Sequence, residues 1–162
     1  MVSMQASINF IIGLIFNQSY SSDIAWEAPH LLRERLNTKT LDLNKLEQLG
    51  LENLKSVIEK RPCLHRFPSK ISEYTYYSIG IINREFGGDP RNIWLDKDYS
   101  KIIENFTQLY GVGQHKAIQG LIILNYLDDS IKVPQKYYEY IERSCPTLLN
   151  NIGNDLCKIL RE

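Results

Sequence analysis

The chain has 162 residues, of which 43% are hydrophobic, and it carries 19 basic and 19 acidic residues. This length predicts one compact domain over residues 1–162, and the hydrophobic content excludes an intrinsically disordered chain. Because the formal net charge is zero, the total charge gives no support to nucleic-acid binding, and any basic surface must be local.

The helical periodicity begins near the amino terminus. Apolar residues at 8, 11, 12, 15 and 16 follow the spacing of one helix face, as an amphipathic helix requires. Phe10 and Leu14 make this helix apolar on most sides, which predicts that it is buried. After the polar stretch NQSYSSD, Ser22 or a neighbour can cap a second helix over 23–36. Pro29 is expected to kink or divide that helix.

The middle of the chain predicts three more helices. Two short helices are expected around 42–49 and 51–60, and the prolines that bracket CLHRF predict a non-helical connection after them. A long helix over 69–85 should end at FGG, where a glycine can take the left-handed conformation. The Asp89–Pro90 pair then signals the start of a short helix.

The last third continues the helical pattern. We expect a helix over 97–109, then a tight turn with two glycines, then a very apolar helix AIQGLIILNYL. Pro134 and Pro146 are expected in the first turns of two final helices. Since no segment alternates as a strand would, the predicted fold class is all-α, with about ten helices.

The cysteines and the apolar stretches bear on location and cofactors. The three cysteines have long spacings and no CxxC pair, which predicts reduced thiols in a cytoplasmic protein rather than a disulfide framework or a zinc site. The longest apolar stretch, INFIIGLIF, is too short to span a bilayer. We therefore expect no metal, no cofactor and no membrane partner.

The glycine turn, residues 109–113, lies within the stretch LYGVGQHKA. Gly111 can take a positive φ and turn the chain sharply, and Gly113 stands where the next helix starts. The first N–H groups of a helix lack internal partners and attract anions, and Lys116 can add a cation. The alternative is an ordinary helix end followed by a compact turn.

LYGVGQHKA resembles the helix-hairpin-helix element of the base-excision DNA glycosylases, the superfamily of endonuclease III and adenine glycosylase, whose hairpin has the form L-x-G-[VIF]-G-x-x-x-A. IIGLIFNQSYSSDIAW is similar to the first helix of that family and the glutamine-containing corner after it. LHRFPSKI, FGGDPRNIW and the tail look like a small uncharacterised branch of helix-hairpin-helix proteins. The resemblance covers nearly the whole chain.

The resemblance implies a two-lobed, all-helical fold with a DNA-facing cleft between the lobes and a hairpin at about 97–127. It implies that the hairpin grips backbone phosphates of double-stranded DNA without reading sequence. The grip would be formed by Gly111, Val112, Gly113, Gln114 and Lys116. Gln18 matches the corner glutamine, which would fill the gap left by an extruded base; alternatively, it caps its own helix. Such a protein would be cytoplasmic and associated with a bacterial or archaeal nucleoid.

The chain departs from the family at the catalytic lysine. Bifunctional members carry this nucleophile two residues after the second glycine, where this chain has His115. Lys116 is one residue further on, and a helix rotates by about 100° per residue, so lyase chemistry through Lys116 is not expected. His115 is a candidate catalytic base; alternatively, it is a first-turn histidine near a phosphate.

The catalytic aspartate of the family is also missing. It stands about twenty residues after the second glycine, in a segment similar to VDTH, and stabilises the cationic sugar or activates water. Val133 occupies that position here. Asp128 and Asp129 are the nearest candidate catalytic carboxylates; alternatively, they end a helix and cap a turn. The four-cysteine cluster loop is absent, so no iron–sulfur cluster is expected.

Further contacts to DNA are open to two interpretations. The segment 55–70 has five basic residues and one acidic residue, with Arg66 among them, and such a patch can follow a DNA backbone or be a solvated surface. Arg91 is a candidate phosphate contact or the partner of a nearby aspartate. The tyrosines of YTYYS and KYYEY can stack on bases or pack between helices.

The sequence thus predicts a DNA glycosylase-like protein that extrudes a damaged or modified base and hydrolyses its glycosidic bond, without lyase activity. Loss of both catalytic signatures of the family raises a first alternative, a helix-hairpin-helix DNA-binding protein without the chemistry. The second alternative is a helical module that binds a protein partner.

Overall fold

The structure is a computed structural model that describes residues 2–17 and 22–162. In these residues it contains nine α-helices, one 3₁₀ helix and no strand, which confirms the all-α class. The elements are α1 (Met4–Phe16), α2 (Ser22–Arg35), α3 (Leu43–Leu49), α4 (Leu51–Glu59), α5 (Pro68–Glu85), η1 (Pro90–Trp94), α6 (Tyr99–Phe106), α7 (Gln114–Leu127), α8 (Gln135–Ser144) and α9 (Pro146–Leu160).

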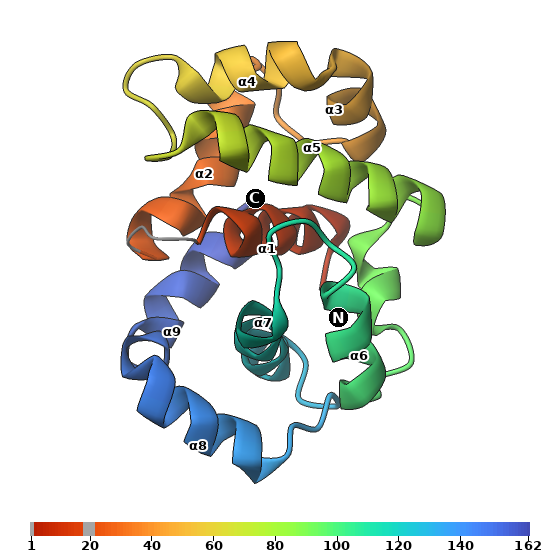
Figure 1. Cartoon of the computed structure of the whole chain (residues 1–162), viewed down its shortest axis with the longest axis vertical. Coiled ribbons are helices and arrows are strands. Elements are labelled where there is room, and N and C mark those ends of the chain that lie inside the picture. Colours follow the sequence, from red (N-terminus) through yellow and green to blue (C-terminus); the bar gives the residue numbers. More distant parts are fainter. Residues whose placement is uncertain (1, 18–21) are drawn as a thin grey trace.

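Helix α1 lies at the centre of the molecule. Figure 1 shows α3, α4 and α5 on one side of it and α6, α7 and α8 on the other. Every residue of α1 from Ala6 to Phe16 is buried, and α1 packs against α2, α5, α9 and η1. A helix that is apolar on most sides has to be surrounded by other elements, so the predicted burial is confirmed.

Close packing of α1 and α2 depends on a glycine. A Cβ atom at Gly13 would lie only 2.0 Å from Cε3 of Trp26, and the Trp26 ring stacks on Phe10 at 6.3 Å between centroids. Gly13 therefore lets the indole of α2 lie directly on the backbone of α1. Pro29 does not divide α2, which runs unbroken from Ser22 to Arg35. Burial of Ala25, Trp26, Ala28 and Leu32 against the core holds the helix together despite the missing N–H.

The turn from α5 into η1 follows the predicted signals. Gly87 and Gly88 both have positive φ angles, of 63° and 77°, and the side chain of Asp89 caps η1 by accepting from the N–H of Arg91. Pro146 lies in the first turn of α9. Pro134 stands one residue before α8 instead, with extended ψ of 144°, so its predicted place was off by one residue.

The connection from α6 to α7 carries the glycine turn. Helix α6 ends at Phe106, three residues earlier than expected, and Leu109 and Val112 point into the core. Gly120, in the middle of α7, brings that helix against Leu14 of α1 and Phe106 of α6, because a Cβ there would meet their side chains at 3.0 and 3.2 Å. The turn is thus anchored on both sides by buried residues.

Two further findings concern the thiols and the membrane. Cys63, Cys145 and Cys157 are all unpaired. Within residues 2–17 and 22–162, no helix combines the length and the apolarity needed to cross a bilayer.

Candidate functional site

The glycine turn leaves the start of α7 open. Gly111 has a φ of 77°, which a residue with a Cβ rarely adopts. Gly113 is the residue before α7, with a φ of −87° and no described side chain capping the helix. Among the described residues, a Cβ at Gly113 would have no atom within 4 Å, and Gln114 after it is exposed. The first N–H groups of a helix lack internal partners, and an anion that approaches this exposed end can bind them.

Lys116, in the first turn of α7, turns inward to the end of α1. Its Nζ donates a hydrogen bond to the main-chain oxygen of Asn17. Burial lowers the pKa of the Lys116 ammonium from 10.5 to about 8, against a smaller opposite effect of the nearby Cys145. Since this side chain is committed to α1, Lys116 is not presented at the open face of the turn, where a phosphate-gripping role would require it.

His65 reaches the same end of α1 from the connection before α5. Its ring is only 3% exposed, and Nε2 lies 3.1 Å from the main-chain oxygen of Phe16. Its Nδ1 accepts from the N–H of Phe67 at 3.0 Å. Because Nδ1 accepts, Nε2 carries the proton and donates to Phe16. The carbonyl groups of Phe16 and Asn17, at the end of α1, thus accept hydrogen bonds from His65 and Lys116, which are far away in sequence.

Arg66 is exposed and follows directly after His65, whose ring contacts the end of α1. The preceding connection is held in place by Arg35 of α2, whose Nη1 donates to the main-chain oxygens of Val57 and Lys60 at 2.8 Å each. Exposed cations accompany Arg66 on this segment: Lys60, Arg61 and Lys70. This segment thus carries a local group of exposed cations and contacts the end of α1 through His65.

His115 is tied into the packing of α7 and α8. Its Nδ1 lies 2.8 Å from the hydroxyl of Tyr140, and its Nε2 lies 2.8 Å from the amide nitrogen of Gln119. Burial, followed by the charge of Lys116, lowers the pKa of the His115 imidazole. Both ring nitrogens are occupied by partners from the protein itself, so a role as base would require one of them to exchange its partner for a substrate.

The two candidate carboxylates lie at the other end of α7. Asp128 follows the last residue of this 14-residue helix, which spans about 20 Å at 1.5 Å per residue. Its carboxylate accepts from the N–H and the hydroxyl of Ser130 at 3.0 and 2.5 Å, and the hydroxyl bond lowers the pKa of Asp128. Asp129 is exposed beside it. The geometry is that of a helix end and a capped turn.

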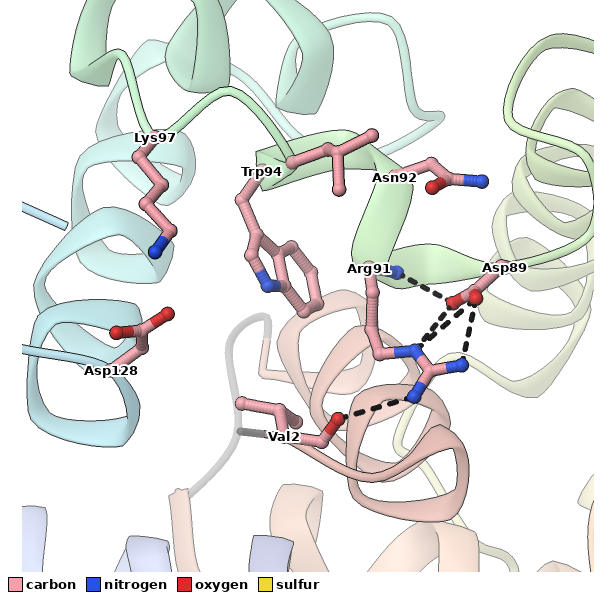
Figure 2. A pocket seen from close by; sticks show the side chains of 8 residues that line it. Val2, Asp89, Arg91, Asn92, Trp94, Lys97 and Asp128 are labelled. Carbon is pink, nitrogen blue, oxygen red and sulfur yellow. Dashed lines mark hydrogen bonds and ion pairs between the residues drawn. The ribbon is translucent and has the colours of Figure 1, made fainter. Parts of the chain in front are cut away.

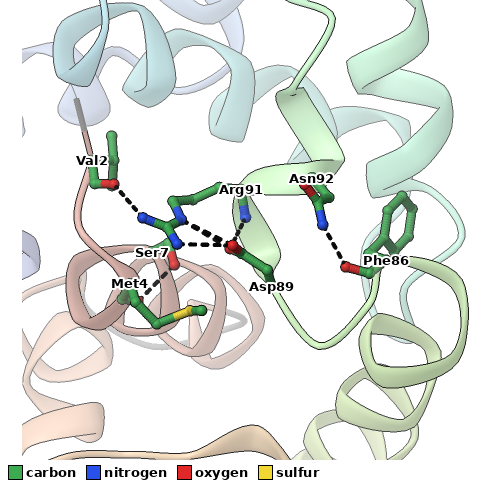
Figure 3. Close-up of polar contacts among 7 residues, drawn as sticks. All are labelled: Val2, Met4, Ser7, Phe86, Asp89, Arg91 and Asn92. Atoms are coloured by element: carbon green, nitrogen blue, oxygen red, sulfur yellow. Dashed lines mark hydrogen bonds and ion pairs between the residues drawn. The ribbon is translucent and has the colours of Figure 1, made fainter.

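Arg91 lies at the amino-terminal end of α1, away from Asn17. Its guanidinium donates from Nε and Nη2 to the carboxylate of Asp89 at 2.9 and 2.8 Å, and from Nη1 to the main-chain oxygen of Val2 at 3.4 Å (Figure 3). Val2 precedes α1 and Asn17 follows it, so this 13-residue helix separates Arg91 from Lys116 by about 20 Å.

Arg91 and Asp128 share a pocket with a volume of about 510 Å³. Figure 2 shows Trp94 between Lys97 on one side and the Arg91–Asp89 pair on the other, with Asp128 near Lys97. The residues expected to act in one site are therefore divided between the two ends of α1. The glycine turn, Lys116, His115 and Arg66 belong to one end, and Arg91 and Asp128 to the other. Gln18 lies outside the described residues.

Comparisons of the chain with models of protein families, with curated proteins and with solved structures found no match. The functional assignment therefore depends on the geometry of the residues themselves.

Proposed function

We propose that this chain is a DNA-binding protein with the helix-hairpin-helix element and two-lobed helical arrangement of the base-excision glycosylases. In this proposal α6, the glycine turn and α7 form the hairpin, which holds a backbone phosphate of double-stranded DNA. The observation that carries the proposal is the open start of α7. Gly111 has a positive φ, no described side chain caps the helix, and a Cβ at Gly113 would meet no described atom within 4 Å.

The surroundings of the glycine turn support the same proposal. A phosphate at the start of α7 would be stabilised by the N–H groups of the first helical turn and by the helix dipole. The exposed cations around Arg66 belong to the segment that meets the same end of α1. Contacts of this kind carry affinity but read no sequence. The expected activity is therefore salt-sensitive binding to duplex DNA of any sequence.

This proposal is tested by the salt dependence of duplex binding. The measurement is the dissociation constant of a fluorescent duplex at several salt concentrations, for the wild type, Arg66→Gln and Arg84→Gln. Arg84 is a matched control because its side chain is 66% exposed and pairs with Glu47 on α3. We expect Arg66→Gln to lower the slope of log K against log salt by about 1, and Arg84→Gln to leave it unchanged. Absence of duplex binding at low salt overturns the proposal.

Base-excision chemistry with Lys116 as nucleophile is a second candidate function. The sequence did not favour it, because Lys116 stands one residue after the position of the family's lysine; the lowered pKa of Lys116 is the observation that raises it. An amine whose pKa has fallen to about 8 is neutral in part near neutral pH and can act as a nucleophile. To attack an exposed sugar, the Lys116 amine has to release its hydrogen bond to the main-chain oxygen of Asn17. Asp128 and Asp129 lie at the opposite end of α7 from Lys116.

Covalent trapping tests this second candidate. If the Lys116 amine condenses with the aldehyde of an abasic sugar, water leaves and an imine forms, which borohydride reduces to a stable amine link. We expect a trapped protein–DNA complex with wild type and Asp128→Asn, and none with Lys116→Met. No trapped wild-type complex, together with no base release from a panel of damaged duplexes, would leave DNA binding without chemistry.

A further inference from the structure

Two exposed tyrosines lie against each other beside the glycine turn. Tyr77 of α5 is 44% exposed and Tyr110 of the turn is 49% exposed. Their ring centroids are 5.3 Å apart, with 40° between the ring planes. Two large rings that contact each other and remain half in solvent are not accounted for by packing in the core, so this surface is available to a partner.

The position of Tyr110 is fixed from α5. The buried hydroxyl of Ser78 accepts from the N–H of Tyr110 at 2.9 Å and lies 3.3 Å from its main-chain oxygen, to which it donates. Both polar groups of the Tyr110 backbone are thereby held by one side chain of α5. The backbone of Tyr110 is thereby fixed to α5, one residue from Tyr77.

The aromatic surface continues along α5 and ends in a cation. Lys70, Tyr74 and Tyr77 are spaced i, i+4 and i+7, so they share one face of the helix. The ammonium of Lys70 lies 6.0 Å from the ring centroid of Tyr74. We call Tyr74, Tyr77 and Tyr110 the tyrosine row. Lys70 lies beside Tyr74, and Tyr110 belongs to the glycine turn.

We propose that the tyrosine row stacks on unpaired bases of the DNA strand whose phosphate is held at the glycine turn. This inference rests on the proposed function of that turn. Sites that bind single strands combine aromatic rings, on which bases stack, with cations along the backbone. Tyr110 directly precedes Gly111 of the glycine turn.

Stacking on the row requires bases that are not paired. In a duplex the faces of the bases are covered by their neighbours, and only their edges are open in the grooves. A strand in which several bases are unpaired exposes those faces. The protein is therefore selective for DNA that contains an unpaired segment, and the glycine turn alone gives it no such preference.

The test compares a fully paired duplex with the same duplex carrying an unpaired central segment. Dissociation constants are measured for wild type, Tyr77→Ala, Tyr110→Ala and the two Phe variants, which keep the rings without the hydroxyls. Tyr126→Ala is the matched control, because Tyr126 is 48% exposed but lies in the last turn of α7. A fluorescent adenine analogue in the unpaired segment reports stacking directly, and circular dichroism confirms that each variant is folded.

We expect wild type to bind the unpaired substrate more tightly than the duplex. Each Ala variant should lose about tenfold in affinity for the unpaired substrate alone, since a base stacked on an aromatic ring contributes on the order of 1–3 kcal/mol. The Phe variants and Tyr126→Ala should match wild type. Equal binding of both substrates by wild type, or equal losses on both in the Ala variants, overturns the inference and leaves the proposed function standing. If neither substrate binds, both fail.

Discussion

Lys116 donates a hydrogen bond from Nζ to the main-chain oxygen of Asn17, the residue that follows α1 as its C-cap. A cation at the carboxyl end of a helix is favoured by the helix dipole, while burial opposes the charge. Burial is the stronger effect, because the pKa of Lys116 falls to about 8. This contact joins the start of α7 to the end of the central helix.

The lowered pKa of Lys116 predicts a specific pH dependence of stability. The unfolded chain holds the Lys116 proton up to its ordinary pKa of 10.5, whereas the folded protein releases it near 8. Between these values the unfolded state binds more protons, so the stability contribution rises with pH. We expect the free energy of unfolding of wild type, relative to Lys116→Met, to increase from pH 8 to 10.5. Denaturant titrations at several pH values measure it; a constant difference would contradict the burial of this charge.

Gly13 and Gly153 should respond in opposite ways to the same substitution. Gly13→Ala places a methyl group 2.0 Å from the Trp26 ring, and overpacking of this kind costs about 1–3 kcal/mol. Gly153→Ala, in α9, meets no atom within 4 Å and should stabilise the helix by about 0.5–1 kcal/mol. Thermal unfolding of both variants checks this. Equal changes in the unfolding temperature of the two variants would mean that the Trp26 ring does not lie on Gly13.

Arg91 is expected to matter for stability and not for DNA. Its guanidinium lowers the pKa of Asp89 from 3.8, so the stabilising contribution of Asp89 is present above pH 3.8 and is lost as pH falls through the lowered pKa. Arg91→Gln should therefore lower the free energy of unfolding near neutral pH. In strong acid the difference in this free energy between wild type and Arg91→Gln should become smaller. Duplex affinity should stay at the wild-type value, because Arg91 lies at the far end of α1 from Lys116. If Arg91→Gln lost as much duplex affinity as Arg66→Gln, Arg91 would belong to the DNA interface.

Local signals in the sequence predicted most of the helices. The two glycines after α5, the Asp89–Pro90 start of η1 and the apolar pattern of α1 each depend on neighbours in the chain, and the structure confirms them. Pro29 was expected to kink or divide α2, and the helix is not divided. Local propensity there is outweighed by burial against the core, which a local pattern does not contain.

The candidate site was predictable only in part, because its decisive contacts are long-range. Gly111 was expected to have a positive φ, and it does. The bond from Lys116 to Asn17 spans 99 positions, and the bond between His65 and Phe16 spans 49. No periodicity encodes such pairs. His65 stood in a basic segment that suggested a surface, yet its ring is buried. The CLHRF connection between two prolines was the one sequence signal that could have indicated a packed loop.

Gly113→Asp distinguishes a start of α7 that holds a phosphate from an ordinary helix start. Aspartate is a preferred helix cap, and Gly113 has a φ of −87° with open space around it, so folding should be unharmed or stabilised by about a few tenths of a kcal/mol. The new carboxylate would occupy the N–H groups and repel a phosphate. Gln135→Asp adds the same charge at the exposed start of α8 and serves as control.

The measurement is duplex affinity at low salt for wild type, Gly113→Asp and Gln135→Asp, with unfolding measured in parallel. We predict a loss of at least about tenfold, equal to 1.4 kcal/mol, for Gly113→Asp alone, with stability kept or raised. Unchanged duplex binding in a folded Gly113→Asp protein would mean that the start of α7 does not hold a DNA phosphate.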